Sequence, residues 1–286
     1  MTVVWRPDYN GTPGKMTLAQ EFTPQSYMYE FPSQYPVWTP ADITTALWLD
    51  AADASTVTTV SNAVSEWRDK SGNARNATQS TAGNRPTYTS AGQNGFNIVT
   101  FQSANTHWLA LPNSAAPSGA NAVFVACKPN NLTANVNIIG RVYNWGSWYL
   151  SSQASGTEGR FSIGRNGIDE ANAIVSGLTN NTDKLFSAIY DNVNISLSVN
   201  AESPTTTAYT FNPSYNANDA AAIGAFRTSS NVVAGVFNGP MYEIIVLHSV
   251  PSTDTRQKLE GYLAHKWGLT ANLPSDHPYK LVGPTP

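Results

Sequence analysis

From about residue 43 onward, the chain alternates short apolar runs with segments rich in glycine, asparagine and serine. Ile195, Leu197 and Val199 alternate with serines, and this two-residue period is typical of a strand with one buried face. The run 244–247 is apolar at every position, which predicts a central strand covered on both faces. Strand follows strand without helices between them, which excludes a parallel βαβ sheet. We therefore predict an all-β fold, either an antiparallel β-sandwich or a barrel.

One segment near the C-terminus departs from this pattern. Ser252 follows a proline and can cap a helix that runs to about Gly268. Apolar side chains recur within it at positions 259, 262, 263 and 267, which form a single stripe on an α-helix. The spacing predicts one amphipathic helix, near residues 252–268, that lies against the sandwich and covers apolar surface.

The first 40 residues differ in composition, because prolines recur there among large aromatic residues. Prolines at this density prevent a regular helix or a central strand, and the rings are too numerous for a solvated linker. These rings are Trp5, Tyr9, Phe22, Tyr27, Tyr29, Phe31, Tyr35 and Trp38. We predict an extended docking arm over residues 1–40 and a sandwich domain over residues 41–286. The arm packs either on a neighbouring subunit, which we favour, or on its own sandwich.

Composition and charge narrow the classes of partner. Of the 286 residues, 12% are charged, and the formal net charge is −3 without any cluster of lysine and arginine. Nucleic-acid binding requires a basic face, so we expect no nucleic-acid partner. No apolar run reaches the ~20 residues of a membrane helix, and we expect no membrane insertion. The single cysteine, Cys127, lies in an apolar run and fits a buried strand position.

The N-terminus shows no basic region followed by an apolar stretch, so we expect no secretory signal peptide. Such a chain is made in a cytoplasm, although its composition is typical of exposed surface proteins. A virus particle reconciles the two observations, because virion proteins leave the cell without being secreted. The expected location is a virion surface, after assembly in the host cytoplasm.

Both ends of the domain resemble a known family. The stretches are 46–53 (ALWLDAAD), 67–72 (WRDKSG), Arg85-Pro86, 243–269 (EIIVLHSVPSTDTRQKLEGYLAHKWGL) and 273–279 (LPSDHPY). They are similar to the first strands and the ending of laminin-G-like, concanavalin A-like jelly rolls, which occur in phage virion proteins and bacterial surface proteins. The resemblance spans roughly residues 43–280 and implies a jelly-roll sandwich. It implies no single function, because the family includes glycan binders, adhesins, structural subunits and some hydrolases.

No arrangement of carboxylates, histidines or hydroxyls indicates an enzyme. The glucanases among the resembling proteins carry a Glu-x-Asp-x-x-Glu strand with its carboxylates on one face, and this spacing is absent here. Asp169 and Glu170 are adjacent, so they point to opposite faces of any strand. The sequence also lacks Gly-x-Ser-x-Gly, His-Glu-x-x-His and phosphate-loop motifs. We therefore predict a protein that is not an enzyme and needs no cofactor.

Aromatic side chains crowd the segment 141–149 and indicate a candidate sugar site. Rings stack on the apolar faces of sugars, and neighbouring asparagine or arginine groups bind hydroxyls. The candidate glycan-binding residues are Tyr143, Trp145, Trp148 and Tyr149, with Arg165 from a later loop. The alternative is a strand whose alternate aromatic side chains enter the core, with a turn at Trp145-Gly146.

Calcium is a further candidate ligand. Many laminin-G-like domains hold it through aspartate and carbonyl oxygens at the rim of the sandwich. Asp191 and Asp219 are the candidate ligands in this sequence, and ordinary turn residues are the alternative interpretation.

Two functions are consistent with these observations. The first is a phage virion structural protein, such as a capsid decoration, head-fibre or tail-associated subunit. Its arm would dock on other virion proteins, its copies would form a homo-oligomer such as a trimer, and its sandwich would bind host-surface glycans. The alternative is a freestanding bacterial carbohydrate-binding or adhesion module. The missing signal peptide, the single cysteine and the arm favour the first.

Overall fold

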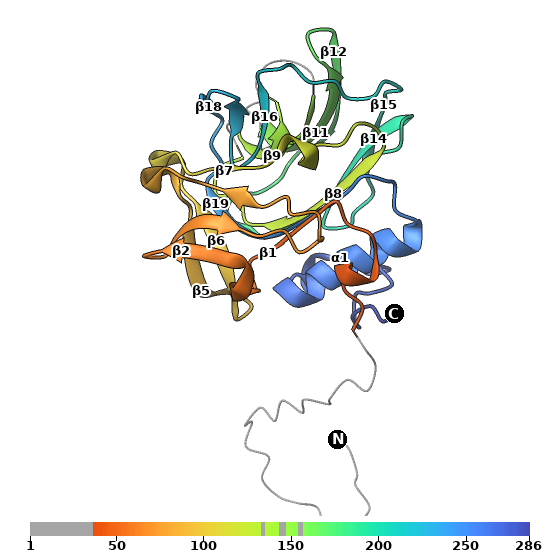
Figure 1. The fold of residues 1–286 in the computed structure, drawn as a ribbon. Helices are drawn as coiled ribbons and strands as arrows, with labels where there is room; N and C mark the ends of the chain where they lie inside the picture. Colours follow the sequence, from red (N-terminus) through yellow and green to blue (C-terminus); the bar gives the residue numbers. More distant parts are fainter. Residues whose placement is uncertain (1–36, 133–134, 143–146, 154–156) are drawn as a thin grey trace, which may run out of the picture. The chain divides into compact units, whose positions relative to one another are not determined.

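The computed structural model describes residues 37–132, 135–142, 147–153 and 157–286. Most of the predicted docking arm therefore lies outside the described residues (Figure 1). The arm residues outside them are Trp5, Tyr9, Phe22, Tyr27, Tyr29, Phe31 and Tyr35. Their role in docking stays a prediction, and the described domain begins at residue 37.

The described domain is almost entirely β-structure, with one α-helix near its C-terminus. Its strands are β1 (Leu47–Asp50), β2 (Val57–Val60), β3 (Ala63–Trp67), β4 (Ala77–Thr78), β5 (Thr87–Gln93), β6 (Phe96–Phe101), β7 (Leu109–Ala110), β8 (Asn121–Cys127), β9 (Asn137–Arg141), β10 (Trp148–Gln153), β11 (Glu158–Arg165), β12 (Asp169–Val175), β13 (Lys184–Tyr190), β14 (Asn194–Val199), β15 (Thr205–Ala208), β16 (Asp219–Ile223), β17 (Phe226–Thr228), β18 (Val233–Ala234) and β19 (Gly239–Leu247). The helix is α1 (Thr253–Trp267), and 3-10 turns lie at Pro40–Asp42, Ala54–Thr56, Ala82–Asn84, Ser103–Asn105, Asn113–Ala115 and Thr270–Asn272.

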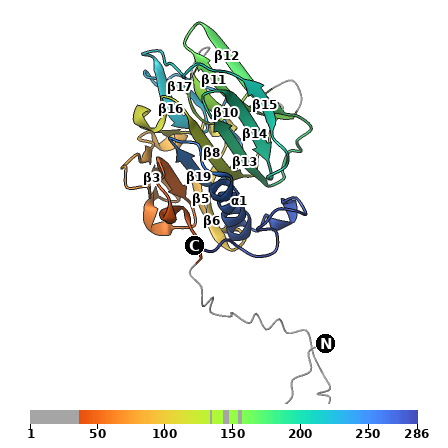
Figure 2. The same ribbon diagram turned by 90° about the vertical axis from the view of Figure 1, so that its right-hand side faces the viewer.

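The strands form one antiparallel ladder that curls back on itself into two layers (Figures 1 and 2). Along paired neighbours, the order is β12-β11-β10-β9-β16-β7-β4-β3-β5-β6-β19-β8-β13-β14-β15. Strand β1 pairs with β19, β2 pairs with β3, and the β17–β18 hairpin extends β16. The two ends of the ladder meet where the Thr207 hydroxyl of β15 donates to the Asn172 carbonyl of β12, at 2.7 Å. This contact gives one carbonyl of the edge strand β12 a hydrogen-bond donor.

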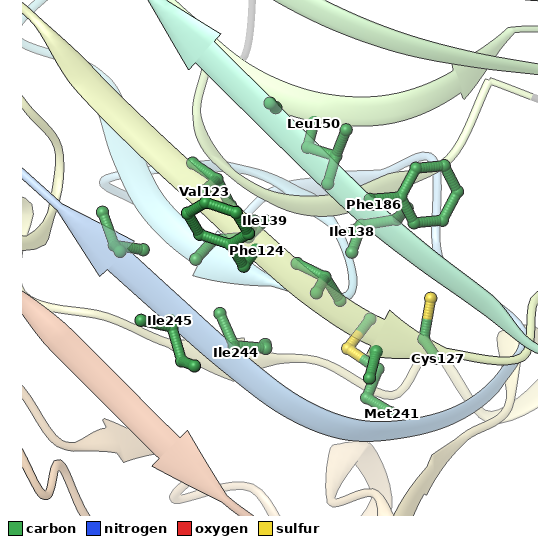
Figure 3. Close-up of a cluster of buried hydrophobic side chains, with 14 of the residues drawn as sticks. Val123, Phe124, Cys127, Ile138, Ile139, Leu150, Phe186, Met241, Ile244 and Ile245 are labelled. Carbon is green, nitrogen blue, oxygen red and sulfur yellow. The ribbon is translucent and has the colours of Figure 1, made fainter. Parts of the chain in front are cut away.

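Strands β8 and β19 are buried on both faces, which explains their continuous apolar sequence. All seven residues of β8 are buried, and β8 pairs with β19 in the register Val125↔Ile244 and Phe124↔Ile245. Figure 3 shows the apolar side chains of these strands gathered with those of β9, β10 and β13. Cys127 lies in this core as predicted, and burial raises the pKa of its thiol.

Helix α1 begins and ends where the sequence predicts. The Ser252 hydroxyl accepts a hydrogen bond from the Thr255 N–H at 3.1 Å, and Gly268 ends the helix with a left-handed φ of 71°. The predicted stripe is buried, with Leu259 and Trp267 fully inaccessible. The helix contacts β8 and β13 (Figure 2), so it supplies the cover that the second face of the central strands requires.

Trp38 departs from the prediction that places it in a docking arm. Its side chain is only 4% exposed and packs edge-on against Tyr262 of α1, with ring centroids 6.4 Å apart. The backbone N–H of Trp38 donates to the Pro284 carbonyl at 3.1 Å. Burying a ring this large in the domain's own core is strongly favourable. Trp38 therefore belongs to the sandwich and is not available for docking on a neighbour.

The prediction of an all-β antiparallel sandwich with one C-terminal helix is confirmed. The alternating segment 195–199 lies within β14, and the apolar run 244–247 lies within β19. In the part of the chain that the structure describes, no helix is both long and apolar enough to cross a bilayer.

Candidate functional site

The two predicted sugar-stacking rings that the structure describes, Trp148 and Tyr149, are buried and do not contribute to a surface site. Trp148 is fully buried, and its indole N–H donates to Asn121 Oδ1 at 3.0 Å. Tyr149 points to the opposite face of β10, where its ring packs edge-on against Phe226 and its hydroxyl donates to Glu170 at 2.8 Å. Both rings are covered because β10 has the core on one face and the β17 segment on the other. The alternative interpretation, a strand with buried aromatic residues, holds for these two, while Tyr143 and Trp145 lie outside the described residues.

Arg165 is engaged with its own hairpin and does not join a ring cluster with Trp148 and Tyr149. Its guanidinium forms an ion pair with Asp169 and lies 3.8 Å from the ring centroid of Phe211. The Arg165 guanidinium, helped by the Tyr209 hydroxyl, lowers the pKa of Asp169 to about 2. This group of side chains ties the β11–β12 turn to the segment after β15.

The two candidate calcium ligands both act within turns. Asp191 Oδ1 accepts hydrogen bonds from the Val193 and Asn194 N–H groups and so closes the turn between β13 and β14. Asp219 Oδ2 accepts from the Asn216 N–H at 2.8 Å and lies at the start of β16. Among the residues that the structure describes, no three histidine, cysteine or acidic side chains are placed to hold a metal ion. A calcium site stays a prediction to which these contacts add no support.

A buried carboxylate joins the central strands to the helix. We call this group the Glu243 cluster, and its members are Trp48, Asp50, Glu243, Tyr262, Lys266 and Trp267. Glu243 Oε1 accepts from the Trp48 indole N–H at 2.7 Å and from the Tyr262 hydroxyl at 3.0 Å. Its Oε2 accepts from Lys266 Nζ at 2.7 Å and from the Trp267 indole N–H at 2.8 Å.

The Glu243 cluster has the geometry of a structural anchor. Glu243 is fully buried, and burial together with the Asp50 carboxylate raises its pKa, while the Lys266 ammonium opposes that shift. Lys266 also bonds Asp50 at 2.6 Å, so its charge has two partners. Every oxygen of the Glu243 carboxylate is occupied by donors of the domain, which leaves none to bind a ligand.

An open polar pocket lies on the other layer, between β4, β7 and the β17–β18 hairpin. We call it the Trp108 pocket, and its lining residues are Ser65, Thr78, Gln79, Ser80, Thr81, Asn84, Arg85, Trp108, Ala110, Arg227, Asn231 and Val233. Its volume is about 520 Å³, which is within the range of small-molecule sites. Figure 1 shows β7, β16 and β18 close together at this part of the domain. Hydroxyl, amide and guanidinium groups dominate the lining, and no carboxylate contributes to it.

Two neighbouring segments hold one wall of the Trp108 pocket in place. The Gln79 side-chain amide donates to the Trp108 carbonyl at 3.0 Å, and the backbone N–H of Trp108 donates to the Asn84 carbonyl at 3.1 Å. Arg85 donates from Nε to the Gln79 carbonyl at 2.9 Å and from Nη2 to the Ser80 carbonyl at 3.0 Å. These bonds fix the loop before β5 against the segment before β7, so the wall is preformed.

Arg227 covers the indole of Trp108. Its guanidinium carbon lies 5.0 Å from the Trp108 ring centroid, which is within cation–π range. Nε donates to Asn231 Oδ1 at 3.0 Å, and Nη1 donates to the Ala221 carbonyl at 3.2 Å. Burial lowers the pKa of Arg227, because the protein around it only partly replaces water.

A second cleft, of about 430 Å³, lies between α1 and the outer face of β13 and β14. Its arginine, Arg256, already forms an ion pair with the buried Glu260 at 2.7 Å. Glu202 and Asp276 also line it, so this cleft carries charges of both signs. The Trp108 pocket differs because its cations have no acidic neighbour in the lining.

The sequence offers little to indicate the Trp108 pocket. Its lining comes from several separated stretches between residues 65 and 233, and no two stretches form a motif. Of the lining residues, only Arg85 lies in a stretch that resembles the family, and the resemblance does not imply a binding role for it. Trp108 stands alone in its segment, whereas the more crowded aromatic segment 141–149 is the one that predicts a sugar site.

Comparisons with known proteins address the fold. A scan against protein-family models and a search of curated proteins both return no match for this sequence. The binding domain of Paraclostridial Mosquitocidal Protein 1 matches with a TM-score of 0.57 and 11% identity, over 76% of this chain and 52% of that chain. Domain 4 of AbnA, a GH43 extracellular arabinanase from Geobacillus stearothermophilus, matches with a TM-score of 0.55 and 14% identity, over 76% of this chain and 98% of that chain. That domain was solved in complex with arabinotriose.

A third match, the receptor binding domain of botulinum neurotoxin D, has a TM-score of 0.52 and 14% identity over 76% of this chain. The chain spans about half the length of the two toxin structures, 52% in each case, and nearly all of the arabinanase domain. At these identities the likeness shows the fold alone. The described domain therefore shares its β-sandwich fold with binding domains of two toxins and with domain 4 of an arabinanase.

Proposed function

We propose that this domain is a carbohydrate-binding module whose ligand enters the Trp108 pocket. The observation that carries the proposal is a preformed pocket of about 520 Å³ lined by hydroxyl, amide and guanidinium groups around a tryptophan. The fold supports it, since an arabinanase domain with the same architecture was solved with arabinotriose.

The chemistry of the lining suits a sugar. A sugar presents many hydroxyls, each of which both donates and accepts a hydrogen bond, and the amides of Asn84 and Asn231 supply both functions. The hydroxyls of Ser65 and Thr81 add further donors and acceptors. Trp108 itself is only 7% exposed and packs against Ala222 and Ala225 beneath Arg227, so its indole supports the wall of the pocket while the polar side chains supply the contacts to the sugar.

A bulky side chain placed in the Trp108 pocket tests the proposal. Thr78 lines the pocket from an exposed position on β4, so Thr78→Trp should fill the space without disturbing the core. We expect glycan binding, measured on a glycan array and then by titration calorimetry, to weaken at least about tenfold, because the ring occupies the volume of the sugar.

Thr89→Trp is the matched control, because Thr89 is also an exposed strand threonine but lies on β5, outside the pocket lining. It should bind glycans like the unmodified protein. Equal binding by both variants would place the ligand elsewhere, and no binding by the unmodified protein to any glycan would refute the proposed function.

We further propose that residues 1–36 anchor this domain to a particle, as in a phage virion structural protein at the surface of the virion. The support is the sequence of the segment, with its prolines and aromatic residues, and the family resemblance of the domain. Trp38 is excluded from the anchor, because it belongs to the sandwich. A freestanding binding module would need no such segment.

Deletion of residues 1–36 tests the anchoring role. The truncated chain keeps Trp38 and the whole described core, so it should unfold at the same temperature as the full chain. We expect light scattering to show a homo-oligomer for the full chain and a monomer for the truncated chain. A truncated chain that assembles like the full one would contradict the proposal without bearing on glycan binding.

A further inference from the structure

The two arginines of the Trp108 pocket lack acidic partners. Arg85 and Arg227 both line the pocket, and within the described ranges neither lies in an ion pair. Elsewhere on the domain, Arg160 pairs with Glu170 and Arg256 pairs with Glu260. The pocket thus gathers positive charge in a chain whose formal net charge is −3.

Each arginine also keeps donor groups that the domain does not use. Arg85 donates through Nε and Nη2, and Arg227 donates through Nε and Nη1. Among the described residues, the Nη1 group of Arg85 and the Nη2 group of Arg227 therefore have no hydrogen-bond acceptor. All the acceptors in use are neutral carbonyl or amide oxygens, which compensate a guanidinium charge less well than an anion does.

Burial makes the missing counter-charge costly at Arg227. Burial lowers the pKa of this guanidinium, which shows that its charged form is less well solvated than in water. The Trp108 ring offsets part of that loss through a cation–π contact at 5.0 Å. An anion in the pocket would supply the remainder, so the site is arranged to gain free energy from a negatively charged ligand.

We infer that the ligand of the Trp108 pocket is an acidic glycan, whose carboxylate or sulfate group binds Arg227 and Arg85. The inference rests on the proposed function, because it names the class of sugar for the same pocket. The planar fork of a guanidinium matches two oxygens of either oxyanion. The hydroxyls and amides of the lining would then hold the rest of the sugar ring.

A matched glycan array tests the charge preference. Each neutral glycan is printed beside its sialylated, glucuronylated and sulfated forms. Comparing these forms separates a ligand with a carboxylate from a ligand with a sulfate. We expect binding to be confined to acidic forms and to weaken when salt is raised to about 0.5 M, because ions screen the attraction.

Variants of one arginine connect the preference to the pocket. Arg227→Gln should weaken binding of the best acidic glycan about tenfold or more, which is the loss typical of a charge-assisted hydrogen bond. Arg227→Lys keeps the positive charge but loses the planar guanidinium. Its affinity for the acidic glycan should lie between that of the unmodified protein and that of Arg227→Gln. Arg68→Gln removes the same charge from an arginine whose side chain is 52% exposed outside the pocket, and should leave binding unchanged.

The outcomes separate this inference from the proposed function. One outcome is that neutral and acidic glycans bind equally well, that Arg227→Gln binds them like the unmodified protein, and that Thr78→Trp does not bind them. This outcome would overturn the inference of an acidic ligand but would still support a glycan site in the Trp108 pocket. Binding to no glycan of the array would overturn both. Acidic binding that Arg227→Gln and Arg68→Gln weaken equally would reflect net charge alone and would also overturn the inference.

Discussion

The Glu243 cluster and the Trp108 pocket use the same side-chain types for opposite purposes. Each places a cation against a tryptophan: Lys266 Nζ lies 5.2 Å from the Trp267 ring centroid, and the Arg227 guanidinium carbon lies 5.0 Å from that of Trp108. In the cluster, a fully buried carboxylate receives four donors. In the pocket, no carboxylate lines the space and the cations keep unused donors.

The difference shows how to separate a structural polar group from a binding group. A buried charge with all its partners inside the domain stabilises one arrangement of strands and helix, and it has nothing left for a ligand. A half-buried charge without a counter-charge has lost part of its hydration and gained no opposite charge in return. A ligand that supplies the opposite charge offsets this free-energy cost. Proximity of charge and aromatic ring is therefore not by itself a sign of function.

The largest effect is expected from Glu243→Ala. The substitution leaves two indole N–H groups, the Tyr262 hydroxyl and the Lys266 ammonium without their shared acceptor. Breaking a buried charged pair by removing one partner typically costs about 3–5 kcal/mol. Urea denaturation should show a loss of that size in the free energy of unfolding.

Glu66→Ala is the control for this loss, because Glu66 makes an ion pair with Arg68 near the surface, at 3.2 Å. Surface pairs contribute at most about 1 kcal/mol. If the two alanine variants unfold at the same urea concentration, the Glu243 cluster is not the anchor of the helix.

A smaller effect is expected from Trp267→Phe. The Phe side chain keeps the stacking on Tyr242, whose ring centroid lies 5.2 Å from that of Trp267. It loses the N–H that donates to Glu243 and some buried volume. We expect the free energy of unfolding to fall by about 1–3 kcal/mol, less than for Glu243→Ala. A larger loss than for Glu243→Ala would show that packing, and not the carboxylate, dominates this region.

The elements of this fold could be predicted from local patterns. The serine alternation over 195–199, the apolar run 244–247 and the Ser252 cap each depend on neighbours in sequence, and each is found as expected. The prediction for Trp38 is wrong because its partner, Tyr262, lies more than 200 residues away in the chain, where no local pattern indicates it.

The candidate site could not be predicted in the same way. Aromatic density at Trp148 and Tyr149 resembles a sugar site, but only the folded structure shows that the core covers one face of β10 and that Phe226 of β17 covers the other. The Trp108 pocket needs β4, β7 and β17 to meet, which is a property of strand order and not of any segment. The binding proposed for this pocket also depends on the absence of a carboxylate from its lining, and no pattern in the sequence indicates that absence.

The smallest effect on stability is expected from Arg227→Gln, although this variant should weaken glycan binding about tenfold or more. The substitution removes a cation–π contact and two hydrogen bonds to neutral acceptors, and it relieves the burial of an uncompensated charge. These contributions oppose each other, so we expect the free energy of unfolding to change by less than about 1 kcal/mol. Urea denaturation without a glycan measures this change. A loss as large as that of Glu243→Ala would make Arg227 a structural anchor as well, and the contrast between the two regions would fail.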